Sequence, residues 1–274
     1  MTTRVAVVGC GFIGAGAIVP GSGVQSHAAA WTRIDGTSLV ALCDTNPLTL
    51  RQAATRWSGA EPFADLGEML ATARPEIVSV ATPDPTHADV LDQVLAAPSV
   101  RAILAEKPLA LDVETAERIV ATAAARGALL AVNYVRRTAP SHRELAGWLA
   151  TDPIGPIELV RGCYVGGIKH NGTHWLDLVR FLVGEIETIR GFGPVDETAT
   201  DATIDVMLEL VSGARGVLTG VRGAQYSLFE MDLLGPGGRV RILDGGHRIE
   251  VLSAAPSPRF PGFRDLLPGA GPAG

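Results

Sequence analysis

The sequence predicts an α/β domain with a doubly wound parallel sheet, followed by an α+β domain with a largely antiparallel open sheet. In residues 1–130, short apolar runs alternate with helical patterns, which is typical of βαβ units and a parallel sheet. In residues 131–254, β-rich runs follow one another across tight glycine turns, which indicates antiparallel pairing. From Ala255 the composition turns to Pro, Gly and Ala, so residues 255–274 are expected to form a poorly ordered tail.

The elements of the first domain follow from its hydrophobic pattern. Runs such as VAVV and ILA are apolar on both faces, as a sheet covered by helices on each side requires. Asp112 can cap the helix that follows it, and Gly127 suits the position just after that helix. The expected order is strand 4–9, strand 38–44, helix 47–57, strand 76–82, helix 86–97, strand 100–105, helix 112–126 and strand 128–134.

The second domain is expected to begin with a short helix over residues 141–150. A second helix starts near His174, where apolar residues recur with helical spacing. The remaining runs are β-rich and closely spaced, which favours an antiparallel sheet. The expected strands are 157–165, 187–193, 203–210, 214–221, 226–235, 238–244 and 247–253.

Composition narrows the possible partners and locations. The net charge of -6 and the pI near 5.5 argue against nucleic acid as a partner. Glycines interrupt the apolar run between Val5 and Pro20, against a secretory signal, and no other stretch approaches the roughly 18 apolar residues of a membrane span. The cysteines are few and widely spaced, which predicts neither disulfides nor a thiolate zinc site and fits a reducing cytoplasm. They are Cys10, Cys43 and Cys163.

A glycine-rich turn directly follows the strand VAVV and has the pattern G-x-G-x-x-G. Such glycines allow a tight turn, close approach of a pyrophosphate and close packing of helix on strand, as in the Rossmann fold. The next strand ends in Asp44, whose carboxylate can bind ribose hydroxyls and would repel a 2′-phosphate, so NAD is favoured over NADP. An inserted loop over residues 15–27 accounts for the long spacing. The residues expected to contact the cofactor here are Gly9, Gly11, Phe12, Ile13, Gly14 and Asp44.

Two further motifs follow strands of the predicted parallel sheet. Ligands of doubly wound sheets lie beyond the carboxyl ends of the strands, so both motifs should face the cofactor. Thr82 and Pro83 follow the third strand and are expected to bind NAD. His87 is also assigned to the cofactor, although a packing or capping role is its main alternative. The second motif is Glu106-Lys107-Pro108, in which the lysine can polarise a substrate oxygen.

The segment KHNGTHWLDLVRF carries two histidines four residues apart. A zinc site would need further ligands, which neither the cysteines nor an H-E-x-x-H motif supplies, so no metal is predicted. His174 and Asp177 fall outside the apolar stripe of the helix and are expected to face the substrate. Asn171 or Thr173 could cap this helix, which would place His170 before its regular turns.

Together these motifs resemble the Gfo/Idh/MocA family of nicotinamide-dependent sugar oxidoreductases, over roughly residues 4–250. The tripeptide at Lys107 is the most specific of them. In that family its lysine binds substrate and assists proton transfer, the bond before its proline is often cis, and its glutamate contacts the cofactor. The resemblance therefore implies these roles for Lys107 and Glu106. The features that carry it are GxGxxG, Asp44, Ala81-Thr82-Pro83 with His87, Glu106-Lys107-Pro108-Leu109, the segment Asn133–Arg137 and the helix with the histidines.

A later motif of the family, D-x-G-x-H, differs here. His174 corresponds to the catalytic histidine, whereas His170 stands in place of the aspartate. The family usually continues past its sheet into further helical segments, so this chain resembles a short form with a variant catalytic motif. We expect Lys107, His174 and His170 to be catalytic. The residues expected to bind substrate are Lys107, Tyr134, Arg136, Asn171 and Asp177.

The resulting hypothesis is an NAD-dependent oxidoreductase that acts on a secondary hydroxyl of a sugar or nucleotide-sugar. His174 would take the hydroxyl proton as hydride leaves the carbon, and Lys107 would stabilise the alkoxide. Two alternatives stay open. One is a lyase or hydrolase that reduces and reoxidises NAD within one turnover, and the other is a cofactor-binding regulatory protein without turnover. A homo-oligomer formed through the second sheet is also expected, because an uncovered apolar face must be buried.

Overall fold

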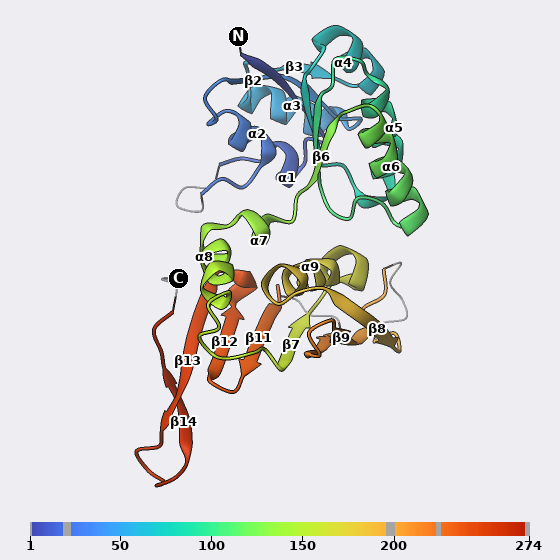
Figure 1. Cartoon of the computed structure of the whole chain (residues 1–274). Helices are drawn as coiled ribbons and strands as arrows, with labels where there is room; N and C mark the ends of the chain where they lie inside the picture. The colour runs from blue at the N-terminus through green and yellow to red at the C-terminus, as the bar shows by residue number, and fades with distance from the viewer. Residues whose placement is uncertain (1, 19–22, 196–200, 223–225, 272–274) are drawn as a thin grey trace. The chain divides into compact units, whose positions relative to one another are not determined.

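The chain divides into two compact units, Met1–Asn133 and Tyr134–Gly274. The computed structural model describes residues 2–18, 23–195, 201–222 and 226–271. The division lies close to the boundary predicted after residue 130. Figure 1 colours the chain from the N-terminus in blue to the C-terminus in red.

Unit 1 is built on a sheet whose described strands lie in the order β3-β2-β1-β4-β5-β6 (Figure 1). All neighbouring strands in it are parallel. The strand order reverses between β1 and β4, which in doubly wound folds marks the place where ligands bind. The predicted Rossmann fold is therefore confirmed. The strands are β1 (Thr3–Val8), β2 (Thr37–Cys43), β3 (Glu61–Phe63), β4 (Ile77–Val80), β5 (Ala102–Ala105) and β6 (Leu129–Val132).

The helices of unit 1 begin and end where the sequence supplies caps. Asp112 accepts a hydrogen bond from the backbone N–H of Thr115 at 2.8 Å, and Gly127 has a φ of 65° after the helix, both as predicted. The helices are α1 (Phe12–Ala15), α2 (His27–Trp31), α3 (Pro47–Arg56), α4 (Leu66–Ala73), the short 3-10 helix η1 (Asp84–Thr86), α5 (His87–Ala96) and α6 (Val113–Ala125).

Two parts of unit 1 differ in detail from the sequence-based expectation. Strand β3 and helix α4 were not predicted, although Asp65 caps α4 by accepting from the backbone N–H of Glu68 at 2.7 Å. The predicted loop over residues 15–27 joins α1 to α2 and ends at Ser26, which caps α2. Residues 19–22 of that loop lie outside the described part of the chain.

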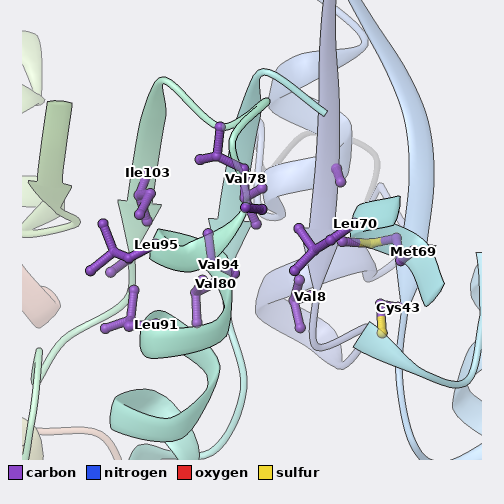
Figure 2. Close-up of a cluster of buried hydrophobic side chains, with 14 of the residues drawn as sticks. Val8, Cys43, Met69, Leu70, Val78, Val80, Leu91, Val94, Leu95 and Ile103 are labelled. Atoms are coloured by element: carbon purple, nitrogen blue, oxygen red, sulfur yellow. The ribbon is translucent and has the colours of Figure 1, made fainter. Parts of the chain in front are cut away.

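Both faces of the parallel sheet are buried, which explains its continuous apolar strands. Along β1, Ala6 and Val8 pack into a cluster with α4, α5 and α6, whereas Val7 packs into another with α1, α2 and α3. Figure 2 shows the first cluster, in which side chains from α5 meet those of β4 and β5. The labelled residues are Val8, Cys43, Met69, Leu70, Val78, Val80, Leu91, Val94, Leu95 and Ile103.

Unit 2 is built on a second sheet, whose described strands lie in the order β14-β13-β12-β11-β7-β10-β9-β8. Strands β7 and β10 pair in parallel, and the other pairs are antiparallel. The predicted α+β domain with a largely antiparallel open sheet is therefore confirmed. The strands are β7 (Leu159–Tyr164), β8 (Ile186–Phe192), β9 (Asp205–Leu210), β10 (Arg215–Gly220), β11 (Phe229–Gly235), β12 (Gly238–Leu243), β13 (Arg248–Pro256) and β14 (Arg264–Pro268).

Helices α8 and α9 pack on one face of this sheet and form the core of unit 2. Leu145 of α8 and Trp175, Leu178 and Val179 of α9 are fully buried against alternate strand residues. Among the helices that the structure describes, none combines the length and apolar character needed to cross a membrane. The helices are α7 (Val135–Thr138), α8 (Pro140–Leu149), the π-helical segment η2 (Gly167–Gly172), α9 (Thr173–Leu182) and the 3-10 turn η3 (Asp244–Gly246).

Residues 255–271 differ from the poorly ordered tail expected over residues 255–274, of which residues 272–274 lie outside the described part of the chain. Strand β13 continues to Pro256, and β14 pairs with it in antiparallel register. Ser257 donates a hydrogen bond to the Asp265 carboxylate at 2.8 Å, which joins the two strands near their turn. Backbone pairing of this kind does not need an apolar composition, which is why the Pro, Gly and Ala content misled the prediction.

Candidate functional site

The glycine turn of unit 1 has the close contacts that its motif predicts. Gly9 has a φ of 87°, and a Cβ atom there would overlap the carbonyl of Ala81. A Cβ at Gly14 would overlap the carbonyl oxygen of Gly9. A Cβ at Gly11, in contrast, would have no described atom within 4 Å. The first and third glycines are therefore required by the fold, and the second leaves open space at the turn.

Asp44 lies at the carboxyl end of β2 and is tied to this turn. Its Oδ2 accepts from the backbone N–H of Cys10 at 2.7 Å, and its Oδ1 accepts from that of Asn46 at 2.7 Å. The residues inserted between the glycines and Asp44 thus do not separate them in space. Burial and the Asp44 carboxylate raise the pKa of the Cys10 thiol to about 12, so this thiol is neutral and no competing nucleophile.

Thr82 supplies a further polar group next to the turn. It follows β4, directly after the Ala81 carbonyl that approaches Gly9. Its hydroxyl oxygen is buried and has no hydrogen-bond partner among the described residues. An orphaned buried hydroxyl points to a ligand group that completes its hydrogen bonding. Together with the open space at Gly11 and the Asp44 carboxylate, Thr82 fits a bound dinucleotide.

Glu106 and Lys107 follow β5, and the Lys107–Pro108 peptide bond is cis. Glu106 Oε1 lies 2.9 Å from His27 Nε2 and accepts from Asn133 Nδ2 at 2.6 Å. Burial acts to raise the pKa of Glu106, but the hydrogen bonds from His27, Asn133 and the backbone N–H of Lys107 outweigh it and lower that pKa. The carboxylate is therefore charged at neutral pH and held from three segments of unit 1.

His87, for which both a cofactor contact and a packing role were considered, is packed against two turns of unit 1. The residue is fully buried, and its two ring nitrogens lie 2.7 Å from Pro108 O and 2.8 Å from Thr82 O. Both ring nitrogens face backbone carbonyls, and a neutral imidazole can donate to one of them. The structure favours the packing alternative, in which His87 holds the Thr82 and Pro108 turns at a fixed separation.

In unit 2, the segment that carries the histidines is capped by a distant loop. The backbone N–H groups of Lys169 and His170 both donate to the Asp201 carboxylate, at 3.0 and 2.8 Å. The prediction that Asn171 or Thr173 caps the helix is wrong. Thr173 donates to the Lys169 carbonyl and Asn171 to the Val165 carbonyl, each at 2.7 Å, because η2 runs directly into α9.

Further N–H groups of η2 are satisfied by the same loop. Gly167 donates to the Thr203 hydroxyl at 3.2 Å, and Ile168 donates to the Ala202 carbonyl at 2.9 Å. Residues 201–203 therefore act as an external cap. His170 lies in a π-helical turn before α9, with an exposed side chain. As predicted, it precedes the regular turns of the helix.

His174 lies in the first turn of α9, next to Tyr134. Their rings meet edge to face, with centroids 5.7 Å apart. Burial raises the pKa of Tyr134, so its hydroxyl stays protonated at neutral pH. Asp177, one turn further along α9, accepts from Arg137 Nε with both carboxylate oxygens, at 2.8 and 2.9 Å. This ion pair joins α7 to α9 and holds Tyr134 near the histidine.

Arg136 contacts later segments of unit 2, and its role in substrate binding stays a prediction. Its guanidinium carbon lies 3.7 Å from the centre of the Phe229 ring, and it donates to the carbonyl oxygen of Gly245 in η3. Burial lowers the pKa of Arg136 to about 10, still well above neutral, so the residue remains a cation. The cation–π contact anchors the chain after β6, and the buried Nε of Arg136 has no hydrogen-bond partner among the described residues.

His142 of α8 is buried near this cation, and we expect it to make stability depend on pH. Burial, Arg136 and His247 lower its pKa to about 4. Because the unfolded chain takes up the proton first, stability should fall by up to about 3 kcal/mol as the pH drops from 6.5 to 4. In urea unfolding, His142→Leu should lose less stability than the wild type over this range. An equal loss in both proteins would contradict the assignment.

Some contributors to these clusters were not predicted. His27 was missed because it lies at the end of an inserted loop, and its only local signal is the capping Ser26 before it. Asn133 belonged to a recognised motif but was given no role. Asp201 carries no local signal at all. Among the described residues, no group of three His, Cys, Asp or Glu side chains could hold a metal ion.

The fold and the glycine turn define the class of protein as a Rossmann-type dinucleotide-binding oxidoreductase. Residues 3–134 match the model of the oxidoreductase family with an NAD-binding Rossmann fold, and residues 142–241 match the GFO/IDH/MocA C-terminal domain. The chain belongs to the GFO/IDH/MocA family. The predicted family, the NAD(P)-dependent dehydrogenase class and NAD as the cofactor are thereby confirmed.

Similar proteins are dehydrogenases. The inositol 2-dehydrogenase of Burkholderia lata is 30% identical over 265 residues, which cover 89% of this chain and 75% of the relative. The D-apiose dehydrogenase of Paraburkholderia graminis is 27% identical over 266 residues, covering 91% and 67%. The crystal structure of the WlbA dehydrogenase from Bordetella pertussis, in complex with NADH and UDP-GlcNAcA, is 26% identical with a TM-score of 0.77, covering 94% and 79%.

Proposed function

We propose that this protein transfers hydride between NAD and a secondary hydroxyl of a sugar, a cyclitol or a nucleotide-sugar. The observation that carries the proposal is the turn after β5, where a charged Glu106 that accepts hydrogen bonds from His27, Asn133 and the Lys107 backbone N–H precedes Lys107. This turn and the glycine turn that fits a dinucleotide follow two strands of the same parallel sheet, β5 and β1. Relatives that act on inositol and D-apiose, and one crystallised with a UDP-sugar, support this substrate range.

The residues of this chain would divide the chemistry as follows. NAD supplies a hydride acceptor. We propose that Asp44 binds its ribose hydroxyls, that Gly11 admits its pyrophosphate and that Thr82 completes a polar contact. Lys107 stabilises the negative charge that develops on the substrate oxygen, and His174 takes the proton. His170 is proposed as a catalytic partner of His174, and Tyr134, Asn171 and Asp177 are proposed to bind the substrate.

A panel of candidate substrates tests this proposal. The full-length protein would be incubated with NAD and, in turn, with inositols, aldopentoses, aldohexoses and UDP-sugars. The expected result is substrate-dependent NADH absorbance with at least one class, and none with the corresponding deoxy compound. Tight NAD binding without net NADH on any compound would contradict net oxidation.

The two alternatives predict distinct results on the same panel. A redox-assisted lyase or hydrolase would convert substrate while NADH stays constant, which product analysis by mass spectrometry would detect. A regulatory protein would bind NAD and convert no substrate. The regulatory alternative is motivated by His170, which stands where the family has an aspartate.

We also propose that the chain forms a homo-oligomer through the face of the second sheet opposite α8 and α9. This face carries apolar side chains together with opposite charges, as isologous interfaces do. Met207 is 52% exposed and Phe192 43% exposed on it. A hollow on the face is lined by Leu159, Thr188, Ile189, Arg190, Phe192, Met207, Leu208, Glu209, Arg215, Gly216 and Val217.

We expect Met207→Arg to shift this protein toward monomer, because a buried unpaired cation in an apolar interface costs several kcal/mol. Light scattering after size exclusion at micromolar concentration would measure the change. Val120→Arg is the matched control, since Val120 is also 52% exposed but lies on α6 of unit 1. A monomeric wild type, or equal behaviour of both variants, would contradict the interface.

A cytoplasmic location is likewise proposed. It is supported by the three cysteines, which are all free thiols in the structure. Reducing compartments maintain thiols in this state. Fractionation of cells that express the native gene would test the location.

A further inference from the structure

We propose that His27 is a positioning residue for Lys107 and acts through Glu106. His27 is the first residue of α2, and 6% of its surface is exposed. Its Nε2 lies 2.9 Å from Glu106 Oε1, and the side chains of this pair are 5% and 15% exposed. The contact joins the end of the inserted loop to the turn that carries the proposed catalytic lysine. This inference rests on the role of Lys107 in the proposed function.

Three donors converge on the Glu106 carboxylate. They come from His27, from the side chain of Asn133 after β6, and from the backbone N–H of Lys107 itself. A carboxylate held in this way is fixed in position, and it fixes the backbone at the start of the lysine side chain. Catalytic groups lose efficiency when their supporting shell allows displacements of about 1 Å.

The charge of Glu106 depends on His27 because the carboxylate is largely buried. Burial alone would raise the pKa of Glu106 and favour its neutral form. The hydrogen bond and the charge of His27, together with Asn133 and Lys107 N–H, lower that pKa instead. A protonated Glu106 would be a weaker acceptor for the Lys107 N–H. Loss of His27 should therefore make the position of Lys107 less well defined, in addition to creating a cavity.

The kinetic test uses the full-length protein with a verified substrate. We expect His27→Leu, which fills the space without a donor, to lower kcat by about 10- to 100-fold. The Kd for NAD should stay within about 3-fold, because His27 contacts Glu106 and not the glycine turn. His27→Gln, whose amide can donate to Oε1, should recover most of the loss. Arg33→Ala, an exposed change just after α2, serves as the control.

The pH dependence gives a readout that a packing role would not change. Among the described residues, His27 is the titratable side chain that contacts Glu106, and Lys107 contacts it through its backbone N–H. Without His27 the pKa of Glu106 should rise, so the acidic limb of kcat in His27→Leu should move to higher pH. An unchanged limb, or a loss of kcat that His27→Gln does not restore, would overturn the proposal.

A second measurement does not depend on turnover. The chain contains two lysines, Lys107 and Lys169, so selective nitrogen-15 labelling of lysine gives two backbone amide signals. Lys169→Arg assigns them. In His27→Leu the Lys107 amide proton should move upfield, as its bond to the carboxylate weakens, while the Lys169 signal stays. An unmoved Lys107 signal would overturn the positioning role. Full activity of Lys107→Ala would instead refute the proposed function.

Discussion

Lys107→Ala is expected to lower kcat by roughly 10²- to 10⁴-fold. The ammonium is the only group of the turn after β5 that can stabilise negative charge on the substrate oxygen, because the Glu106 carboxylate is itself an anion. Lys107→Met, which keeps the length and apolar stem of the side chain, should be as inactive as the alanine variant. The measurement is kcat and KM on a substrate identified in the panel.

The control for Lys107 is NAD binding by the same variants. The glycine turn and Asp44 are unaffected by the substitution, so the Kd for NAD should change by less than about tenfold. Lys107→Arg should also be poor, since a planar guanidinium places its charge differently from an ammonium. A kcat of Lys107→Ala within about 3-fold of the wild type would refute the catalytic role of Lys107, because the loss of an essential charge must lower kcat by much more.

Local motifs explain why the cofactor side of unit 1 was predicted well. The contact of Gly14 lies within the motif, and the contact of Gly9 is with Ala81 after the adjacent strand β4. The requirement for a missing Cβ is nevertheless visible in the letters of the sequence. Asp44 could be placed beside the turn despite its unusual spacing, because adjacent parallel strands end at the same edge of the sheet. The inserted residues lie in a loop and leave this geometry unchanged.

Long-range contacts explain what the sequence could not supply. Local capping rules pointed to Asn171 or Thr173, but the cap of η2 comes from Asp201, some thirty positions along the chain. His27 and Glu106 are 79 positions apart in the sequence, and no periodicity links the two. Arg136 could not be assigned from its neighbours either, because the aromatic face and carbonyl that bind it belong to later strands and turns.

Helix α4 is a different kind of omission, since its signal was present. Asp65 followed three residues later by Glu68 is a capping pattern, and the apolar residues after it are spaced for one buried helix face. The segment is only eight residues long and lies between Trp57 and β4, where a loop was assumed. Short helices gain most of their stability from tertiary packing, so their local signals are weak.

Gly14→Ala and Gly11→Ala are expected to fail in different ways, although they alter the same motif. A Cβ at Gly14 would overlap the carbonyl oxygen and carbon of Gly9, and these backbone atoms cannot move aside as a flexible side chain could. We expect a loss of stability on the order of 3 kcal/mol, with weaker NAD binding as a consequence. A Cβ at Gly11 meets no described atom within 4 Å, so Gly11→Ala should fold with nearly unchanged stability.

The defect of Gly11→Ala should appear only with the cofactor. If the open space at Gly11 is where backbone approaches the pyrophosphate, an added methyl group should raise the Kd for NAD by at least about tenfold. Urea unfolding without ligand and calorimetric titration with NAD separate the two effects. A Gly11→Ala variant that binds NAD as tightly as the wild type would place the pyrophosphate elsewhere, because a methyl group cannot share that space with a phosphate.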